Sequence, residues 1–380
     1  MKLNKILYVL CFMFLFEKQG FSRDIDIGDN HTLQYSGYVG WQQLWSNNEI
    51  ESTYNKSGKP ELGLNIIYDR DNLQIFNQFR YGENSDTYLV YNFAQYTFNL
   101  ADDVNLSLRG GKLRHELGLY NTTRVNPRTR QGVIQPQSIY WDVFDELLTS
   151  GVGVSASLQY KDFEFIYTID KPSIADNDKT TRVFSAGLLT ESSHEFGDHQ
   201  TAALIYSPKN LPLLAKATWA QLNAGDKTTK QADILFPELK GTDWIAEYIT
   251  FGTEYKFQKL TVSGEILWFK TPNVDWGDES IDPHFSLTGV YDIVENLQLR
   301  LNYNQANSFL TSKLLPNSPE RAYRKDFNLG LRYYITNDLM LQAEGHYIKG
   351  SRTMDTVDIR QSPDNWEQWW LVGTNIVYFF

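Results

Sequence analysis

Charged residues are unevenly distributed in the stretch from residue 112 to residue 148. The basic side chains come first and the acidic ones last: Lys112, Arg114, Arg124, Arg128, Arg130, Asp142, Asp145 and Glu146. Groups of opposite charge that face each other across a narrow passage create a transverse field and sort the ions that pass between them. If the stretch folds into a channel, these residues are predicted to form its constriction. If it packs on an outer rim instead, the same charges are only solvated.

The histidines, cysteines and candidate nucleophiles do not form a catalytic or metal-binding pattern. The six histidines are scattered along the chain, and Gly-x-Ser-x-Gly does not occur. His115 lies beside Glu116 in the most suggestive position, where a polar lining role is favoured. His194 and His199 are five residues apart in an expected loop, which is a weak basis for a metal site. We therefore predict no catalytic residue, no cofactor and no metal site.

The first 22 residues have the pattern of a secretory signal peptide. A basic start is followed by an apolar run over residues 6–16 and by the small-x-small pattern Gly20-Phe21-Ser22. The apolar run is shorter than the ~20 residues of a membrane-spanning helix. We expect cleavage near Ser22. Cleavage there would remove Cys11, the only cysteine, and exclude disulfides and cysteine metal sites from the mature chain.

The charge balance after residue 22 is acidic. Removing Lys2, Lys5, Lys18 and Glu17 from the 35 basic and 46 acidic residues leaves 32 and 45, a net charge of −13. A nucleic-acid partner would need a basic surface, so we predict none. No later run approaches ~18 apolar residues, yet 14% of the residues are aromatic. Tyr and Trp gather where an apolar wall meets water. An outer-membrane β-barrel is therefore favoured over a secreted enzyme.

Segments of alternating polarity with the length of a transmembrane strand, ~9–11 residues, recur along the chain. We predict strands in Leu33–Trp45, Leu62–Tyr68, Leu73–Tyr81, Tyr88–Phe98, Val104–Arg109, Gly151–Tyr160, Phe163–Ile169, Gln200–Tyr206, Leu213–Leu222, Trp244–Phe257, Leu260–Phe269, His284–Tyr291, Leu297–Tyr303, Phe327–Tyr333, Leu339–Tyr347 and Trp369–Phe380. The predicted fold class is all-β, a transmembrane antiparallel β-barrel of about 16 strands formed by one domain, residues 23–380.

Short turns and long loops alternate between these segments, as in barrels with short periplasmic turns and longer external loops. Val183–Leu189 could form a further strand, but counting it would break the alternation. Residues 171–199 are therefore interpreted as one external loop. The stretch at 112–148, after the fifth strand, is far longer than an ordinary connection, which favours a functional role. Its Leu, Ile, Tyr and Trp content favours packing over disorder, and we expect it to fold into the lumen.

Strand parity also predicts which charged side chains face the lumen, because alternate residues of a strand point to opposite faces. The predicted lumen-facing residues are Arg80, Arg109, Lys216, Glu254, Arg300, Arg332 and Glu344, with Glu164 and Glu265 as further acidic candidates. Arg or Lys on the lipid face would cost ~2–4 kcal/mol near the midplane. A wall with charges of both signs predicts weak selectivity. Each charge could equally belong to an ion pair that braces the wall.

The segment Gly111-Lys112-Leu113-Arg114, followed by Leu117-Gly118-Leu119-Tyr120, resembles the strand end and loop of Gram-negative porins related to the phosphate-selective group. This resemblance implies a passive diffusion channel, a homotrimer and an internal loop that forms the constriction. It also implies that the alternating residues of the last strand are read by the barrel-assembly machinery as an insertion signal: Trp370, Ile376, Tyr378 and Phe380. The chain is acidic overall, so phosphate specificity is not carried over.

The predicted function is therefore a water-filled channel for small hydrophilic solutes or ions in the bacterial outer membrane. The predicted partners are membrane lipid, lipopolysaccharide, the barrel-assembly machinery and two further copies of the chain. A barrel enzyme of the lipase or protease type is the first alternative, and it would need a nucleophile or an acid–base set at the rim. A surface adhesin is the second, and it would need a filled lumen, because about sixteen strands leave an aqueous interior.

Overall fold

Each predicted segment forms a strand in the computed structural model of the protein. The structure describes residues 23–28, 30–47, 58–81, 87–124, 126–140, 150–172, 194–226, 243–271, 280–308, 322–351 and 367–380. The strands are β1 (Arg23–Gly28), β2 (His31–Ser46), β3 (Lys59–Arg70), β4 (Leu73–Tyr81), β5 (Thr87–Ala101), β6 (Val104–Arg114), β7 (Ser150–Tyr160), β8 (Phe163–Pro172), β9 (His194–Tyr206), β10 (Leu213–Asp226), β11 (Asp243–Phe257), β12 (Leu260–Thr271), β13 (Ser280–Val294), β14 (Leu297–Asn307), β15 (Tyr323–Tyr334), β16 (Leu339–Gly350) and β17 (Trp369–Phe379). Among these described residues, no helix is long and apolar enough to cross a membrane.

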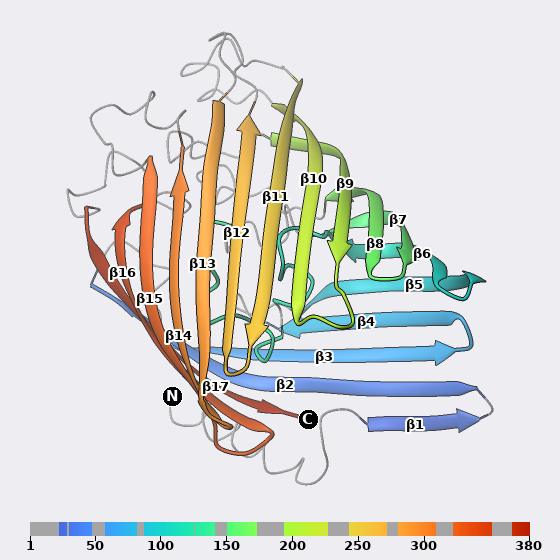
Figure 1. The fold of residues 1–380 in the computed structure, drawn as a ribbon, viewed down its shortest axis with the longest axis horizontal. Coiled ribbons are helices and arrows are strands. Elements are labelled where there is room, and N and C mark those ends of the chain that lie inside the picture. The colour runs from blue at the N-terminus through green and yellow to red at the C-terminus, as the bar shows by residue number, and fades with distance from the viewer. Residues whose placement is uncertain are drawn as a thin grey trace.

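The strands β2 to β17 form a closed antiparallel barrel of 16 strands, which confirms the predicted fold class. Each strand pairs with the next along the chain, and the ring closes where β17 pairs with β2, from Leu371 opposite Ser46 to Phe379 opposite Tyr38. Figure 1 shows the neighbouring strands β9 to β16 side by side, with β17 beside β2. Closure leaves this ring without a free edge that could pair with another chain.

One strand, β1, was not predicted from the sequence. It pairs with the start of β2, from Arg23 opposite Tyr35 to Gly28 opposite His31. The next part of the same edge of β2 pairs with the C-terminal residues. There, Gly37 and Phe380 exchange backbone hydrogen bonds of 2.8 and 3.0 Å. β1 therefore continues the line of β17 along β2. This segment has only six residues, three of them charged, and is therefore too short and too polar for the pattern that predicts a membrane strand. The possible strand Val183–Leu189 lies outside the described residues.

The two faces of the sheet differ as a membrane barrel requires. On β17, Trp370 and Val372 are 57% and 44% exposed, whereas Leu371 and Val377, which point to the other face, are fully buried. On the other strands the exposed set is also large and apolar, and examples are Val154, Phe257, Leu301 and Leu329. The buried set is largely polar, and examples are Thr250, Asn302, Asn328 and Asn375. An apolar outer face suits lipid, and a polar inner face suits a hydrated interior.

The tight turns between consecutive strands also follow from the sequence. Asp71, Lys161 and Gln258 begin two-residue turns and adopt φ angles of 49°, 54° and 50°. This left-handed conformation matches the twist of two-residue hairpins. Asp is one of the residues that tolerate it most readily.

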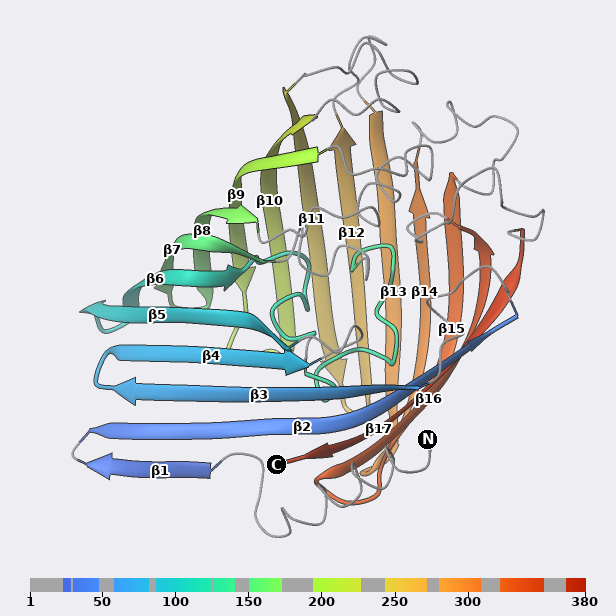
Figure 2. The same cartoon turned by 180° about the vertical axis from the view of Figure 1, so that it is seen from behind.

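Residues 115–140, which follow β6 and are described except for Val125, pack against the buried face of the sheet. Leu117, Ile139 and Tyr140 form an apolar cluster with residues of β10, β11 and β12. Val133 and Ile134 form a second cluster with residues of β2, β16 and β17. Figure 2 shows this segment, in teal, on the inner side of the curved sheet. The two clusters fix the segment at separate places on the wall and so position the polar groups between them.

Candidate functional site

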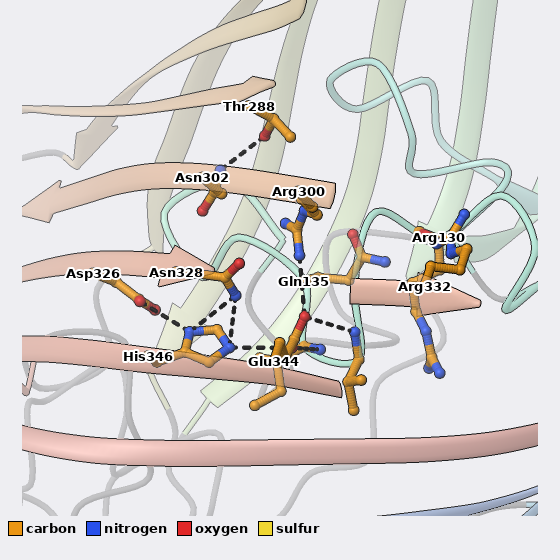
Figure 3. Close-up of polar contacts among 12 residues, drawn as sticks. Arg130, Gln135, Thr288, Arg300, Asn302, Asp326, Asn328, Arg332, Glu344 and His346 are labelled. Atoms are coloured by element: carbon orange, nitrogen blue, oxygen red, sulfur yellow. Dashed lines mark hydrogen bonds and ion pairs between the residues drawn. The ribbon is translucent and has the colours of Figure 1, made fainter. Parts of the chain in front are cut away.

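Glu344 on β16 is the centre of one set of contacts between the 115–140 segment and the inner face. Its carboxylate accepts hydrogen bonds from the backbone N–H groups of Val133 (3.0 Å) and Ile134 (2.6 Å). It also pairs with Arg300 of β14 at 3.2 Å and lies 3.1 Å from Nε2 of His346. Figure 3 shows these groups converging on the buried carboxylate. Charge-assisted hydrogen bonds from several directions hold Glu344 in one orientation.

The same network continues along the inner face to Asp326 on β15. Oδ1 of Asp326 lies 2.9 Å from Nδ1 of His346, and Oδ2 accepts a hydrogen bond from Arg324 at 3.0 Å. Each ring nitrogen of His346 therefore faces a carboxylate oxygen, as drawn in Figure 3. This arrangement suits an imidazolium ring, in which both nitrogens donate.

Glu265 on β12 makes the second set of contacts with the segment. Its carboxylate accepts hydrogen bonds from the backbone of Leu119 (2.7 Å) and from the hydroxyl of Tyr140 (2.5 Å). The Tyr140 hydroxyl accepts a hydrogen bond in turn from the backbone of Tyr120 (2.8 Å), whose own hydroxyl donates to Glu254. Burial and the neighbouring carboxylates raise the pKa of Tyr120 and of Tyr140 above the ordinary value. Both hydroxyls therefore remain protonated donors at neutral pH.

Gly118 explains why the chain can approach Glu265 so closely. Its φ angle is +55°, a conformation that L side chains rarely adopt. A Cβ at this position would also lie 2.7 Å from both the Glu265 carboxylate and the Tyr140 hydroxyl. Gly132 has the same role at the other contact, because a Cβ there would overlap the guanidinium of Arg300.

Arginines hold the middle of the segment through its backbone. Arg332 on β15 donates to the carbonyl oxygens of Arg128 (3.1 Å) and Arg130 (2.5 Å). Arg128 itself donates to the carbonyl of Asn337 in a short turn at 2.6 Å, and its guanidinium lies 4.2 Å from the ring centre of Phe379. The segment thus reaches from the end of β6 to the turn between β15 and β16.

A cavity of about 170 Å³ lies between the segment and the inner face. Charged groups of both signs contribute to its lining: Arg130, Arg300, Arg332, Glu254 and Glu344. Arginines keep their charge at any pH at which the protein is folded. A hydrated ion or a small polar solute in this space would meet fixed charges and hydrogen-bonding groups.

Comparison with solved structures identifies the fold. No protein-family model and no curated protein matches the sequence. The anion-selective porin from Comamonas acidovorans has 13% sequence identity and a TM-score of 0.62, with 92% of this chain and 100% of that chain covered. The fold is that of the outer-membrane porins. Salmonella typhi OmpF, in a complex with daunomycin, is 12% identical with a TM-score of 0.61, over 94% of this chain and all of OmpF.

A third solved structure has a similar fold. OmpT of Vibrio cholerae, described as an outer-membrane protein in a trimer form, is 12% identical. Its TM-score is 0.57, over 93% of this chain and all of that one. At such low identities the likeness concerns the fold. The roles of residues in this porin-fold barrel therefore depend on its own geometry.

The residues predicted for the constriction lie in different places in the porin-fold barrel. Arg128 and Arg130 belong to the contacts described above. Arg114 and Arg124 are buried beside aromatic rings, 5.2 Å from the ring centre of Tyr91 and 5.9 Å from that of Tyr140. Lys112 is in register with Val152, which is 60% exposed, so the structure does not bring it together with the other basic residues. The acidic part of the prediction lies outside the described residues: Asp142, Asp145 and Glu146.

Most residues predicted to face the lumen take part in specific contacts. Lys216 binds Glu116 at 2.5 Å, Arg109 donates to Gln95 at 2.5 Å, and Arg80 lies 3.6 Å from Glu61. Glu61 is also 3.4 Å from Arg130. Glu164 accepts a hydrogen bond from Ser157 at 2.5 Å. Together with the Arg300–Glu344 pair, these contacts fit the alternative in which the charges brace the wall and the segment.

The residues predicted as an insertion signal lie in the closing strand β17 or directly after it. Trp370 and Ile376 lie in β17 in register with Tyr347 and Leu341 of β16, and Tyr378 is in register with Leu339. Phe380 follows β17 and packs its ring against Gly37. Their position at the closing strand is described by the structure, whereas their role in assembly stays a prediction.

Sequence reasoning missed the partners of the predicted charges. Glu61 and Asp326 were not singled out, and Glu116 was noted only as the neighbour of His115, although each lies within 4 Å of a basic group. Strand parity could have placed Asp326 on the inner face, because Phe327 and Leu329 beside it face outward. The pairing itself had no signal in the sequence, since the partners belong to different strands.

Proposed function

We propose that the protein is a porin of the bacterial outer membrane, which forms a water-filled channel for passive diffusion of small hydrophilic solutes or ions. One observation carries the proposal: the 115–140 segment is bonded to the inner face at Glu344 and Glu265, beside a cavity with charges of both signs. In this proposal the segment narrows the channel, and the cavity is part of the passage. The apolar outer face and the porin fold support it.

Weak ion selectivity follows from the same lining. Three arginines and two glutamates contribute to the cavity, and Arg300 and Glu344 neutralise each other at 3.2 Å. Small solutes therefore meet a polar passage without a continuous ladder of one sign. Selectivity should depend chiefly on Arg332 from β15 and on Arg130 from the segment, whose partner Glu61 is not among the residues that line the cavity.

Export and assembly complete the proposal. Residues 1–22 would direct export and be removed, and the last strand would be recognised by the barrel-assembly machinery through Trp370, Ile376, Tyr378 and Phe380. The mature barrel would contact membrane lipid and lipopolysaccharide and assemble as a homotrimer. The trimer form described for OmpT of Vibrio cholerae supports this last point. Enzymatic activity is not part of the proposal.

Planar-bilayer recordings of the purified protein test the proposal. We expect stepwise conductance, and a reversal potential in a salt gradient that shifts toward cation preference in R130Q. R124Q is the matched control, because Arg124 is buried beside Tyr140 and is not among the residues that line the cavity. Absence of stepwise conductance from folded protein would overturn the channel. Equal shifts in R130Q and R124Q would place the constriction elsewhere.

A further inference from the structure

A second cluster of buried groups lies at the start of the 115–140 segment. Nε2 of His115 is 2.6 Å from Oδ2 of Asp170 on β8 and 3.2 Å from Nδ1 of His199 on β9. Nδ1 of His199 is 3.6 Å from Oδ1 of Asp170. Both histidines are completely buried and Asp170 is 3% exposed. Two ring nitrogens and one carboxylate thus converge on one point from three parts of the chain.

The hydrogen bonds within this arrangement compete with one another. A proton on Nε2 of His115 points either at Asp170 or at Nδ1 of His199, so it cannot serve both contacts. Oδ1 of Asp170 is buried, and Nδ1 of His199 faces it at 3.6 Å, too far for a good hydrogen bond. A buried carboxylate oxygen without a partner is costly. A cation between the three groups would satisfy the lone pairs that face one another.

The ligand types and distances identify the class of cation. Imidazole nitrogens suit zinc, copper, nickel and iron, whereas magnesium and calcium prefer oxygen ligands only. Ligand bonds of about 2.0–2.2 Å in a tetrahedral zinc site place neighbouring ligand atoms roughly 3.3 Å apart. The three candidate ligand atoms lie within 4.8 Å of one another, and the two nitrogens are 3.2 Å apart. Modest rotations of the side chains would complete the site.

We propose that His115, Asp170 and His199 form a binding site for one divalent transition-metal ion of the zinc class. Tyr248 on β11 supports the site, because its hydroxyl lies 3.0 Å from Nε2 of His199 and holds that ring with Nδ1 toward the metal. The backbone of His115 is fixed in turn by Asn121, whose side chain donates to the His115 carbonyl at 2.8 Å. The site therefore has both ligands and the supporting contacts that orient them.

The bound ion would join the first residue of the 115–140 segment to the barrel wall. His115 directly follows β6, whereas Asp170 and His199 belong to β8 and β9, beyond the intervening strand β7. No metal site was predicted from the sequence, because the three residues do not form a short motif. Asp170 lies 55 positions after His115, and His199 lies 84 positions after it. The earlier candidate pair joined His199 to His194, whose side chain lies outside the described set.

Metal titration of the full-length barrel, folded in detergent without a histidine tag and stripped with chelator, tests the site. Zn²⁺ added to the wild-type protein should bind at one equivalent per chain. D170N and H199Q should each weaken that binding at least ten-fold. H284Q is the matched control, because His284 is also buried against the segment, 2.9 Å from the carbonyl of Ser138, and lies outside the cluster. H284Q should bind like the wild type.

Co²⁺ provides a readout that does not require a variant to fold. Bound at this site in the wild-type protein, it should give the ligand-field absorption of a low-coordinate nitrogen–oxygen environment, and one equivalent of Zn²⁺ should abolish the signal. Absence of both the Co²⁺ spectrum and stoichiometric Zn²⁺ binding would overturn the site. Equal affinity in folded D170N and wild type would overturn it as well.

Discussion

The two buried histidine clusters hold the same segment to the barrel wall, but they differ in the ratio of rings to carboxylates. At the start of the segment, His115 and His199 share the single carboxylate of Asp170. Toward its middle, the single ring of His346 lies between two carboxylates, those of Asp326 and Glu344. Both clusters are buried in the inner face.

This difference decides what each cluster can bind. Around His346, the arginines Arg300 and Arg324 pair with the two carboxylates, so protons and guanidinium groups supply the positive charge. Around Asp170, nitrogen lone pairs are in excess, and an external cation would supply the charge. The His346 cluster is therefore complete without a ligand, whereas the His115 cluster is completed by a metal ion. Three substitutions or treatments distinguish these two types of anchor.

Substitution of Glu344 should have the largest effect. E344Q removes the negative charge that Arg300 and His346 face and weakens the acceptor for Val133 and Ile134. Breaking a buried ion pair by removing one partner typically costs about 3–5 kcal/mol, because the remaining charge stays buried. We expect the free energy of unfolding in urea, followed by tryptophan fluorescence in lipid, to fall by about this amount.

Glu247 provides the control for this measurement. Its ion pair with Lys270, at 3.5 Å, has side chains that are 37% and 35% exposed. Exposed pairs contribute about 0–1 kcal/mol, so E247Q should change the free energy of unfolding very little. Equal losses in E344Q and E247Q would show that the Glu344 network does not anchor the segment.

Removal of metal should have an intermediate effect that is confined to the His115 cluster. With free Zn²⁺ at 100 times its dissociation constant, a bound ion stabilises the folded state by about 2.7 kcal/mol. Chelator should therefore lower the unfolding temperature of the wild type and of E344Q, but not that of D170N. An unfolding temperature of the wild type that does not respond to chelator would contradict the metal-dependent anchor.

The sequence predicted the strands of this barrel far better than its anchors. Alternation along a strand is a local property, so all sixteen segments from Leu33 to Phe380 were recognisable without knowledge of their neighbours. It also assigned Glu344 and Arg300 to the inner face. The contacts that use them join residues far apart in the chain, such as Ile134 and Glu344, which are 210 positions apart. No periodic pattern carries that information.

The segment itself shows the same limit. Its apolar composition indicated packing rather than disorder, and Leu117, Ile139 and Tyr140 are buried in a cluster with the wall. Its separated charges suggested one functional set, yet Arg114 and Arg124 lie against aromatic rings and Lys112 belongs to β6. Charge order in the sequence was informative only where the backbone also brought the side chains together.

Substitution of Tyr140 should have the smallest effect and should separate the contacts at Glu265 from the His115 cluster. Y140F removes the hydrogen bond to Glu265 and the acceptor for the Tyr120 backbone, but leaves the His115 cluster intact. A hydrogen bond to a charged group contributes about 1.5–3 kcal/mol, and the lower end applies because Leu119 still donates to Glu265. The response to chelator should be unchanged, because the metal ligands are untouched.

The pH dependence of stability provides a second test of the same substitution. Burial and Glu265 raise the pKa of Tyr140 well above the ordinary value of 10.0, so the folded state holds this proton more tightly than the unfolded state does. The resulting stabilisation is complete below pH 10 and is lost as pH rises toward the folded-state pKa. The free energy of unfolding of the wild type, measured by urea titration at several pH values from 8 to about 11, should therefore decrease more steeply above pH 10 than that of Y140F. Parallel curves for the two proteins would mean that the Tyr140 hydroxyl is not the buried donor to Glu265 that fixes this end of the segment.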